Sequence, residues 1–171
     1  MDNKNRAMLI EILHDMEDFA KLKGLKCPPI YLLGGSGCIA GGYINRATTD
    51  FDILNMDYPA YAGRIFRLLG ETDYLDMDLT TIAAGFENRA IKLEEYKYLD
   101  IYVLSKEDII VTKIGRYSEK DIQDIEELIK SSDKTLILDL IDKVNQRTDI
   151  GKKIKEEFIK NVTVFRRQFI V

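Results

Sequence analysis

The sequence predicts an α/β (or α+β) fold with a small sheet, flanking helices and a helical C-terminal region. Short apolar runs of strand length occur at residues 30–33, 51–55 and 99–104. Four helical patterns then follow one another between residues 106 and 168. The chain has 171 residues, 46% hydrophobic and 32% charged, which suffices for a buried core and argues against disorder. We expect one compact unit, with a core at residues 1–130 and a helical region at 131–171 packed on it.

The first half of the chain alternates helical and strand patterns. A helix is expected at residues 6–23, where apolar residues recur at helical spacing and Gly24 follows as a C-terminal cap. The strand at 30–33 leads into Gly34-Gly35-Ser36-Gly37, which we expect to form a turn. Part of 37–44 is expected to be helical, followed by a strand at 51–55. Pro59 is expected to open a third helix and Gly70 to close it.

Residues 73–104 are less regular. The segment 99–104 is a strand, 90–93 is a possible strand, and 75–79 is ambiguous. The C-terminal helices are expected near 106–115, 119–131, 135–146 and 152–168. Ser118 and Asp121 have the spacing of a capping box at the start of the second of these.

The segment from Gly34 to Asp52 carries the most informative chemistry. A strand that ends in a glycine-rich turn exposes backbone N–H groups suited to phosphate oxygens. Asp50 and Asp52 are two positions apart on the next strand, so their side chains should share a face. Mg²⁺ prefers such oxygen ligands and often shares its shell with substrate phosphates. The pattern predicts metal-assisted phosphoryl or nucleotidyl transfer, the alternative being a strand end whose acids are merely solvated.

These residues resemble the signature of the polymerase-beta-like nucleotidyltransferases, namely Gly35-Ser36 followed by Asp50-x-Asp52 between apolar residues. Arg46 and Thr48 resemble the abortive-infection and type IV toxin branch of that superfamily and its relatives of unknown function. The resemblance spans roughly residues 30–130. It implies a mixed sheet flanked by helices and a third carboxylate. It also implies transfer of a nucleoside monophosphate from an NTP with Mg²⁺ (or Mn²⁺).

The third carboxylate has two candidates. Asp100 precedes an apolar strand, where an acid is costly unless it is paired or metal-bound. Asp76 and Asp78 form a second Asp-x-Asp pair, but no glycine turn precedes it. We expect Asp50, Asp52 and Asp100 to be the metal ligands and catalytic carboxylates.

A basic run follows the last strand. Lys113 and Arg116 are three apart and share a helix face, which by default would be solvated. The run resembles a Lys…Arg…Asp pattern of the toxin-like branch, which implies contacts with the triphosphate. Asp121 is expected to orient Lys113 or Arg116, and Asp124 to be exposed. The expected nucleotide-binding residues are Gly34, Gly35, Ser36, Arg46, Thr48, Lys113, Arg116, Lys120 and Asp121.

The charge is unevenly distributed. The whole chain carries −4, which disfavours a general nucleic-acid coat, but residues 143–171 hold eight Lys/Arg and three acids. This segment is expected to be a helix that packs through the apolar residues Ile154, Phe158, Val162 and Phe165. Its basic residues would border the active site or a partner surface for RNA or an acidic protein, or simply be solvated.

Other features narrow the location. No stretch is long enough to span a bilayer, and charges interrupt the N-terminal apolar run, so we expect a cytoplasmic protein. Cys27 and Cys38 are expected to be reduced, and His14, the only histidine, to lie at the surface.

The expected function is metal-dependent transfer of NMP from an NTP donor to a hydroxyl acceptor, such as a tRNA end, a protein or a small molecule. By resemblance, the chain would be a toxin of a toxin–antitoxin or phage-defence system, with an antitoxin partner. The alternative is a non-catalytic nucleotide- or partner-binding module on the same fold.

Overall fold

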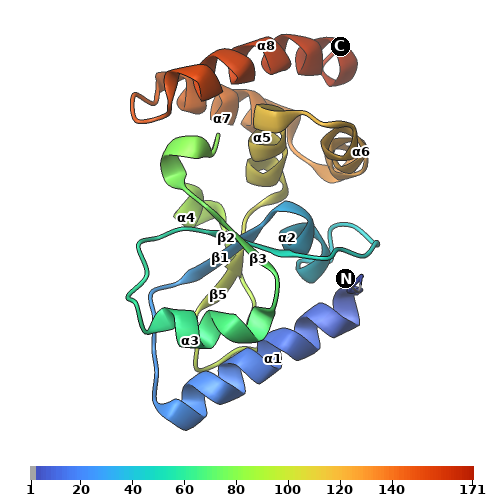
Figure 1. The fold of residues 1–171 in the computed structure, drawn as a ribbon. Coiled ribbons are helices and arrows are strands. Elements are labelled where there is room, and N and C mark those ends of the chain that lie inside the picture. Colours follow the sequence, from blue (N-terminus) through green and yellow to red (C-terminus); the bar gives the residue numbers. More distant parts are fainter. Residues whose placement is uncertain (1–2) are drawn as a thin grey trace. The chain divides into compact units, whose positions relative to one another are not determined.

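The computed structural model describes residues 3–171, and its contacts divide the chain into two compact units (Figure 1). Unit 1 comprises the chain up to Leu75 together with Ala90–Leu104, and unit 2 comprises Asp76–Arg89 and Ser105–Val171. The boundary between the two units therefore does not lie at residue 130, where we expected the core to end. The helices between residues 105 and 131 group with the C-terminal helices, because they share one apolar core with them.

Unit 1 contains a five-stranded mixed sheet, as the resemblance implies. Its strands are β1 (Ile30–Leu33), β2 (Phe51–Leu54), β3 (Thr72–Leu75), β4 (Ile91–Lys92) and β5 (Ile101–Val103), in the order β3-β2-β1-β5-β4. β1 pairs with β2 in antiparallel fashion and with β5 in parallel fashion. β2 and β3 are parallel, whereas β4 and β5 are antiparallel. The ambiguous segment is resolved as β3 followed by a 3₁₀ turn, η2 (Met77–Leu79).

The helices of unit 1 are α1 (Arg6–Lys23), α2 (Gly34–Ala40) and α3 (Ala62–Phe66), the last continued by the 3₁₀ turn η1 (Arg67–Leu69). α1 ends at Gly24, whose φ of 63° is left-handed, as predicted. The expected glycine turn is instead the first turn of α2. Of the glycines in this turn, only Gly34 has a positive φ, of 60°, and this single residue redirects the chain from strand to helix.

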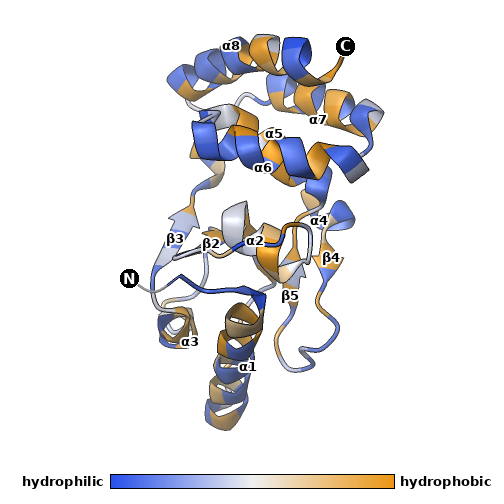
Figure 2. Cartoon of the chain, turned by 90° about the vertical axis from the view of Figure 1, so that its right-hand side faces the viewer, coloured by the Kyte–Doolittle hydropathy of each residue, from blue (hydrophilic) through white to orange (hydrophobic). Residues whose placement is uncertain are grey.

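Unit 2 is helical. It contains α4 (Phe86–Arg89), α5 (Lys106–Arg116), α6 (Glu119–Leu128), the 3₁₀ turn η3 (Ile129–Ser131), α7 (Lys134–Gln146) and α8 (Lys152–Phe169). The predicted capping box between Ser118 and Asp121 is present at the start of α6. α8 packs on α5 and α7 and buries Phe158, Val162 and Phe165, so the predicted apolar stripe is confirmed. Figure 2 shows this alternation of hydrophobic and hydrophilic residues along α8.

Arg147 is a structural residue of unit 2. Its guanidinium donates to the carbonyl oxygens of Thr80 (2.9 Å), Ile82 (2.8 Å) and Met77 (2.8 Å), and it pairs with Asp149. It thereby ties the 77–82 segment to the connection between α7 and α8. One of the eight basic residues of the C-terminal segment is therefore committed to the fold.

Three smaller expectations can be compared with the structure. Cys27 and Cys38 are not joined in a disulfide, and His14 is exposed beside the ring of Tyr96. No helix between residues 3 and 171 combines the length and the apolarity needed to cross a bilayer.

Candidate functional site

The junction of β1 and α2 is joined to β2 through Ser36. The backbone N–H of Asp52 donates to Ser36 Oγ at 2.8 Å, and the Ser36 hydroxyl donates to the carbonyl oxygen of Leu33 at 3.2 Å. The Ser36 side chain is completely buried. The hydroxyl that we expected to bind phosphate instead donates its proton within the fold, and it fixes Asp52 relative to the start of α2.

Gly34 lets the Asp52 carboxylate lie directly against the start of α2. A Cβ atom at Gly34 would stand 2.3 Å from Asp52 Oδ2 and 2.7 Å from its Cγ, closer than any side chain allows. The backbone of Gly34 is also left-handed. Both constraints require glycine here, and together they place the carboxylate over backbone rather than over a neighbouring side chain.

Gly35 provides a similar opening for a cation and a hydroxyl. Its Cβ position would lie 2.9 Å from Nη2 of Arg46 and 3.3 Å from Oγ1 of Thr48. Arg46 also donates to the carbonyl oxygen of Ala47 at 2.9 Å, and Thr48 is buried. The structure thus brings six of the predicted residues together: Gly34, Gly35, Ser36, Arg46, Thr48 and Asp52.

Asp50 lies at the same end of β2 as this group. It is half-buried and occupies a bend immediately before the strand. The strand alternation used to predict its direction begins only at Phe51.

The structure does not bring Asp100 together with Asp52. Ile101 pairs with Ile30 at the start of β1, whereas Asp52 pairs with Leu33 at its end. Asp100 is therefore displaced by about four residues, or roughly 13 Å, along the strand direction. It is half-exposed and forms an ion pair with Lys92 at 3.0 Å, which satisfies its charge. The rivals Asp76 and Asp78 lie in unit 2.

Asp73 is the carboxylate that sequence reasoning missed. The parallel register of β2 and β3 pairs it with Asp52. Paired residues on neighbouring strands point to the same face, about 4.8 Å apart at the backbone. The available signal was the Thr72-Asp73-Tyr74 run after Gly70, which has strand-forming residues around an acid.

The acids of this group suit a hard cation whose shell is completed by other oxygens. No cluster of three or more His, Cys, Asp or Glu side chains poised for a metal occurs within residues 3–171. Mg²⁺ sites commonly use only one or two carboxylates, with waters and substrate phosphates supplying the rest. The donor set around Asp52 is therefore compatible with Mg²⁺ bound together with a phosphate compound.

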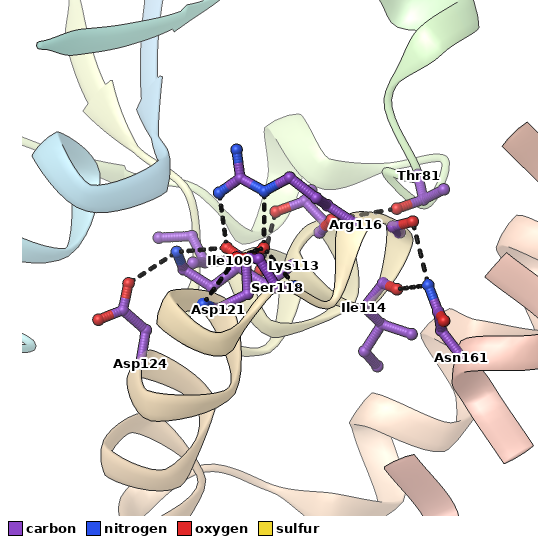
Figure 3. A network of polar contacts seen from close by, with 11 residues as sticks. Thr81, Ile109, Lys113, Ile114, Arg116, Ser118, Asp121, Asp124 and Asn161 are labelled. Atoms are coloured by element: carbon purple, nitrogen blue, oxygen red, sulfur yellow. Dashed lines mark hydrogen bonds and ion pairs between the residues drawn. The ribbon is translucent and has the colours of Figure 1, made fainter. Parts of the chain in front are cut away.

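The predicted basic run forms a charge network in unit 2 (Figure 3). Arg116 makes two hydrogen bonds with Asp121, at 2.7 and 2.8 Å. Lys113 Nζ lies 2.8 Å from Asp124 Oδ2 and 3.5 Å from Asp121 Oδ1. The expectation that Asp121 orients the basic residues is confirmed. The expectation that Asp124 is exposed is wrong, because Asp124 is buried as the partner of Lys113.

Asp121 is held ionised in this network. Burial alone would raise its pKa, but hydrogen bonds from Arg116 and Ser118 and the charge of Lys113 outweigh burial and lower the pKa to about 2. Two cations thus face two carboxylates. The Lys113 side chain is only 6% exposed, whereas that of Arg116 is 73% exposed, so Arg116 is far more accessible to a ligand. Lys120, in the first turn of α6, is exposed.

The chain matches the model of a known family. A family model described as a nucleotidyltransferase of unknown function (DUF6036) matches residues 7–168. No curated protein and no solved structure matches the chain. The family match spans nearly the whole chain, including all the candidate site residues described above.

Proposed function

Because the chain belongs to this family of nucleotidyltransferases of unknown function, we propose that it transfers the NMP moiety of an NTP to a hydroxyl acceptor with Mg²⁺ or Mn²⁺. The observation that carries the proposal is the Asp52 carboxylate lying against the backbone of Gly34, beside Arg46 and Thr48 over Gly35. An acid, a cation and a hydroxyl gathered beside the strand-to-helix backbone are groups that a metal-bound phosphate can use.

The metal would be held by Asp52 together with one further carboxylate, Asp50 or Asp73, and waters and phosphate oxygens would complete its shell. Bound Mg²⁺ supplies charge neutralisation for the phosphates and polarises the phosphorus under attack. The protein's own contribution is orientation. Ser36 fixes the backbone of Asp52 by a 2.8 Å hydrogen bond, so the carboxylate is positioned before substrate arrives.

Arg46 and Thr48 would contact phosphate oxygens. α2 has only seven residues, so the dipole of so short a helix contributes little, and a side-chain cation is needed near the start of α2. Arg46 supplies that charge and Thr48 supplies a hydroxyl, both over Gly35. In unit 2, Arg116 is the better candidate than Lys113 for a phosphate contact, because Lys113 is buried between two carboxylates. Lys120 and Asp121 remain proposed neighbours of that contact.

The acceptor we propose is an RNA end, a protein hydroxyl or a small molecule. A toxin role with an antitoxin partner is proposed from the likeness of Arg46 and Thr48 to the toxin-like branch. A second candidate is a nucleotide-binding module without catalysis. It is favoured by the lack of a three-acid metal cluster in the described part of the chain.

Calorimetric titration with the Mg²⁺ complexes of ATP, GTP, CTP and UTP tests the proposal, followed by transfer of α-labelled NTP into RNA and protein. Binding with transfer supports the enzyme, and binding without transfer supports the module. Replacing Asp50 and Asp52 together by Asn should abolish binding while the fold persists. Unchanged affinity in the folded double variant would end the metal hypothesis.

A matched pair of variants separates the two candidates for the third carboxylate. Asp73→Asn should weaken Mg·NTP binding about tenfold or more, since it removes a carboxylate in register with Asp52. Asp100→Asn should leave affinity within about twofold, because Asp100 lies at the other end of β1 and pairs with Lys92. The reverse order of effects would restore Asp100 and remove Asp73.

A further inference from the structure

We propose that the N-terminal arm, residues 3–5, is a positioning element that holds the 46–49 loop over Gly35. The inference rests on the proposed function, because that loop carries Arg46 and Thr48. Lys4 lies outside the segment 7–168 matched by the family model, so the match assigns it no role.

Lys4 binds the loop at three points. Its backbone N–H donates to the carbonyl oxygen of Thr48 at 2.7 Å, and the Thr48 N–H donates to the carbonyl oxygen of Lys4 at 3.0 Å. These two bonds form an isolated antiparallel bridge. The Lys4 ammonium donates to the carbonyl oxygen of Thr49 at 2.6 Å. The backbone of Lys4 thus binds Thr48, and its side chain binds the next residue of the loop, Thr49.

The loop has little other backbone support. Within the described residues, every backbone–backbone hydrogen bond of the 46–49 loop is made with Lys4. The loop follows Gly41 and Gly42 and precedes β2. Its position relative to Gly35 therefore depends on the arm, and with it the places of the Arg46 guanidinium and the Thr48 hydroxyl.

The arm is itself anchored by α1. Asn5 caps this helix, since its side chain accepts from the N–H of Met8 at 3.0 Å. α1 buries Leu9, Leu13, Met16 and Ala20 in unit 1. The arm thus connects a well-packed helix to a weakly supported loop. Such preorganisation reduces the ordering cost of binding and should raise affinity.

The test compares wild type with a variant lacking residues 2–4, in which Asn5 and the capped helix remain. Amide exchange by NMR should show at least about tenfold faster exchange at Thr48, whereas the Asp52 amide, bonded to Ser36, stays protected. Affinity for the best-bound of the four Mg·NTP complexes should fall about tenfold. The melting temperature serves as the control for global stability.

Point variants keep the test decisive if the deletion does not fold. Lys4→Met removes only the contact with Thr49 and should weaken NTP binding about threefold, whereas Lys4→Arg should restore it. Lys97→Met, at an exposed lysine of unit 1, is the control and should bind as wild type.

Unchanged Thr48 protection, or lost protection with unchanged NTP affinity, overturns the positioning role while leaving the proposed function intact. Absence of NTP binding by wild type removes both proposals.

Discussion

At the residue scale, the missing side chain of Gly34 leaves the space that the carboxylate of Asp52 occupies. A methyl group at Gly34 would overlap Asp52 Oδ2, at 2.3 Å, and the φ of 60° penalises any L side chain. Both the left-handed turn of the backbone and the position of the Asp52 carboxylate therefore require glycine at position 34. Stability and ligand binding should depend on it together.

Gly34→Ala is expected to lower the free energy of unfolding by about 2 kcal/mol or more and to abolish Mg·NTP binding, because Asp52 must move. Denaturant unfolding and calorimetry measure the two effects. Gly63→Ala is the matched control, since a Cβ there meets nothing within 4 Å, and it should be neutral or slightly stabilising. A folded Gly34→Ala protein with normal affinity would contradict the assigned contact.

Asp121 gives a pH-dependent prediction. Its pKa falls from 3.8 to about 2 in the folded state because the contacts with Arg116, Ser118 and Lys113 outweigh burial. The carboxylate therefore contributes on the order of 2 kcal/mol above pH 4, and this contribution is lost as the pH falls from about 4 to 2.

Denaturant unfolding of wild type and Asp121→Asn at pH 6, 4, 3 and 2 measures this dependence. The variant should be less stable at pH 6, and the difference should shrink toward pH 2, where wild type also loses the charge. A difference that stays constant across this range would show that Asp121 contributes through packing alone.

At the scale of the element, α8 is held by its apolar stripe rather than by its charges. Phe158, Val162 and Phe165 are buried, whereas Lys152 is almost fully exposed and interacts only weakly with Glu156, at 3.9 Å. The neighbours Phe158 and Ile159 differ sharply, with 0% and 50% of their surface exposed.

Phe158→Ala should cost about 3–5 kcal/mol because it empties a fully buried site. Ile159→Ala, one position along the same helix, should cost less than about 1 kcal/mol. Thermal unfolding followed by circular dichroism compares the two variants. Equal losses would mean that helix propensity, and not burial against α5 and α7, stabilises α8.

At the scale of the whole molecule, the chain enters unit 2 twice, at Asp76–Arg89 and again from Ser105 onward. The first entry is joined to the C-terminal helices by Arg147, and by the Gly151 N–H donating to the Asp78 carbonyl oxygen at 3.1 Å. Unit 2 therefore depends on segments far apart in sequence, and it should not tolerate loss of its last helix.

Truncation after residue 150 should lower the melting temperature and cause association on size-exclusion chromatography. The change uncovers the apolar faces of α5 and α7 that α8 buries, and exposed patches of this kind associate. Truncation after Phe169 is the control and should behave as wild type. A soluble, equally stable product ending at residue 150 would show that α8 is a dispensable segment.

The sequence by itself determined most helices, though not α4, most strands and the grouping of Gly34, Gly35 and Asp52. Helical spacing, caps such as Gly24 and Ser118, and the short connection from β1 to β2 are local, so they are visible in consecutive residues. The expectation of a turn at Gly34–Gly37 was wrong because one left-handed glycine suffices to start α2 at once.

The tertiary structure alone decided which distant residues meet. The pairing of β2 with β3 places Asp73 in register with Asp52, and the pairing of β1 with β5 places Asp100 at the far end of β1. The packing of α6 against α5 buries Asp124 beside Lys113, and the path of the arm brings Lys4 to Thr48. Strand register and helix packing depend on contacts between segments far apart in the chain, which the periodicity within each segment does not encode.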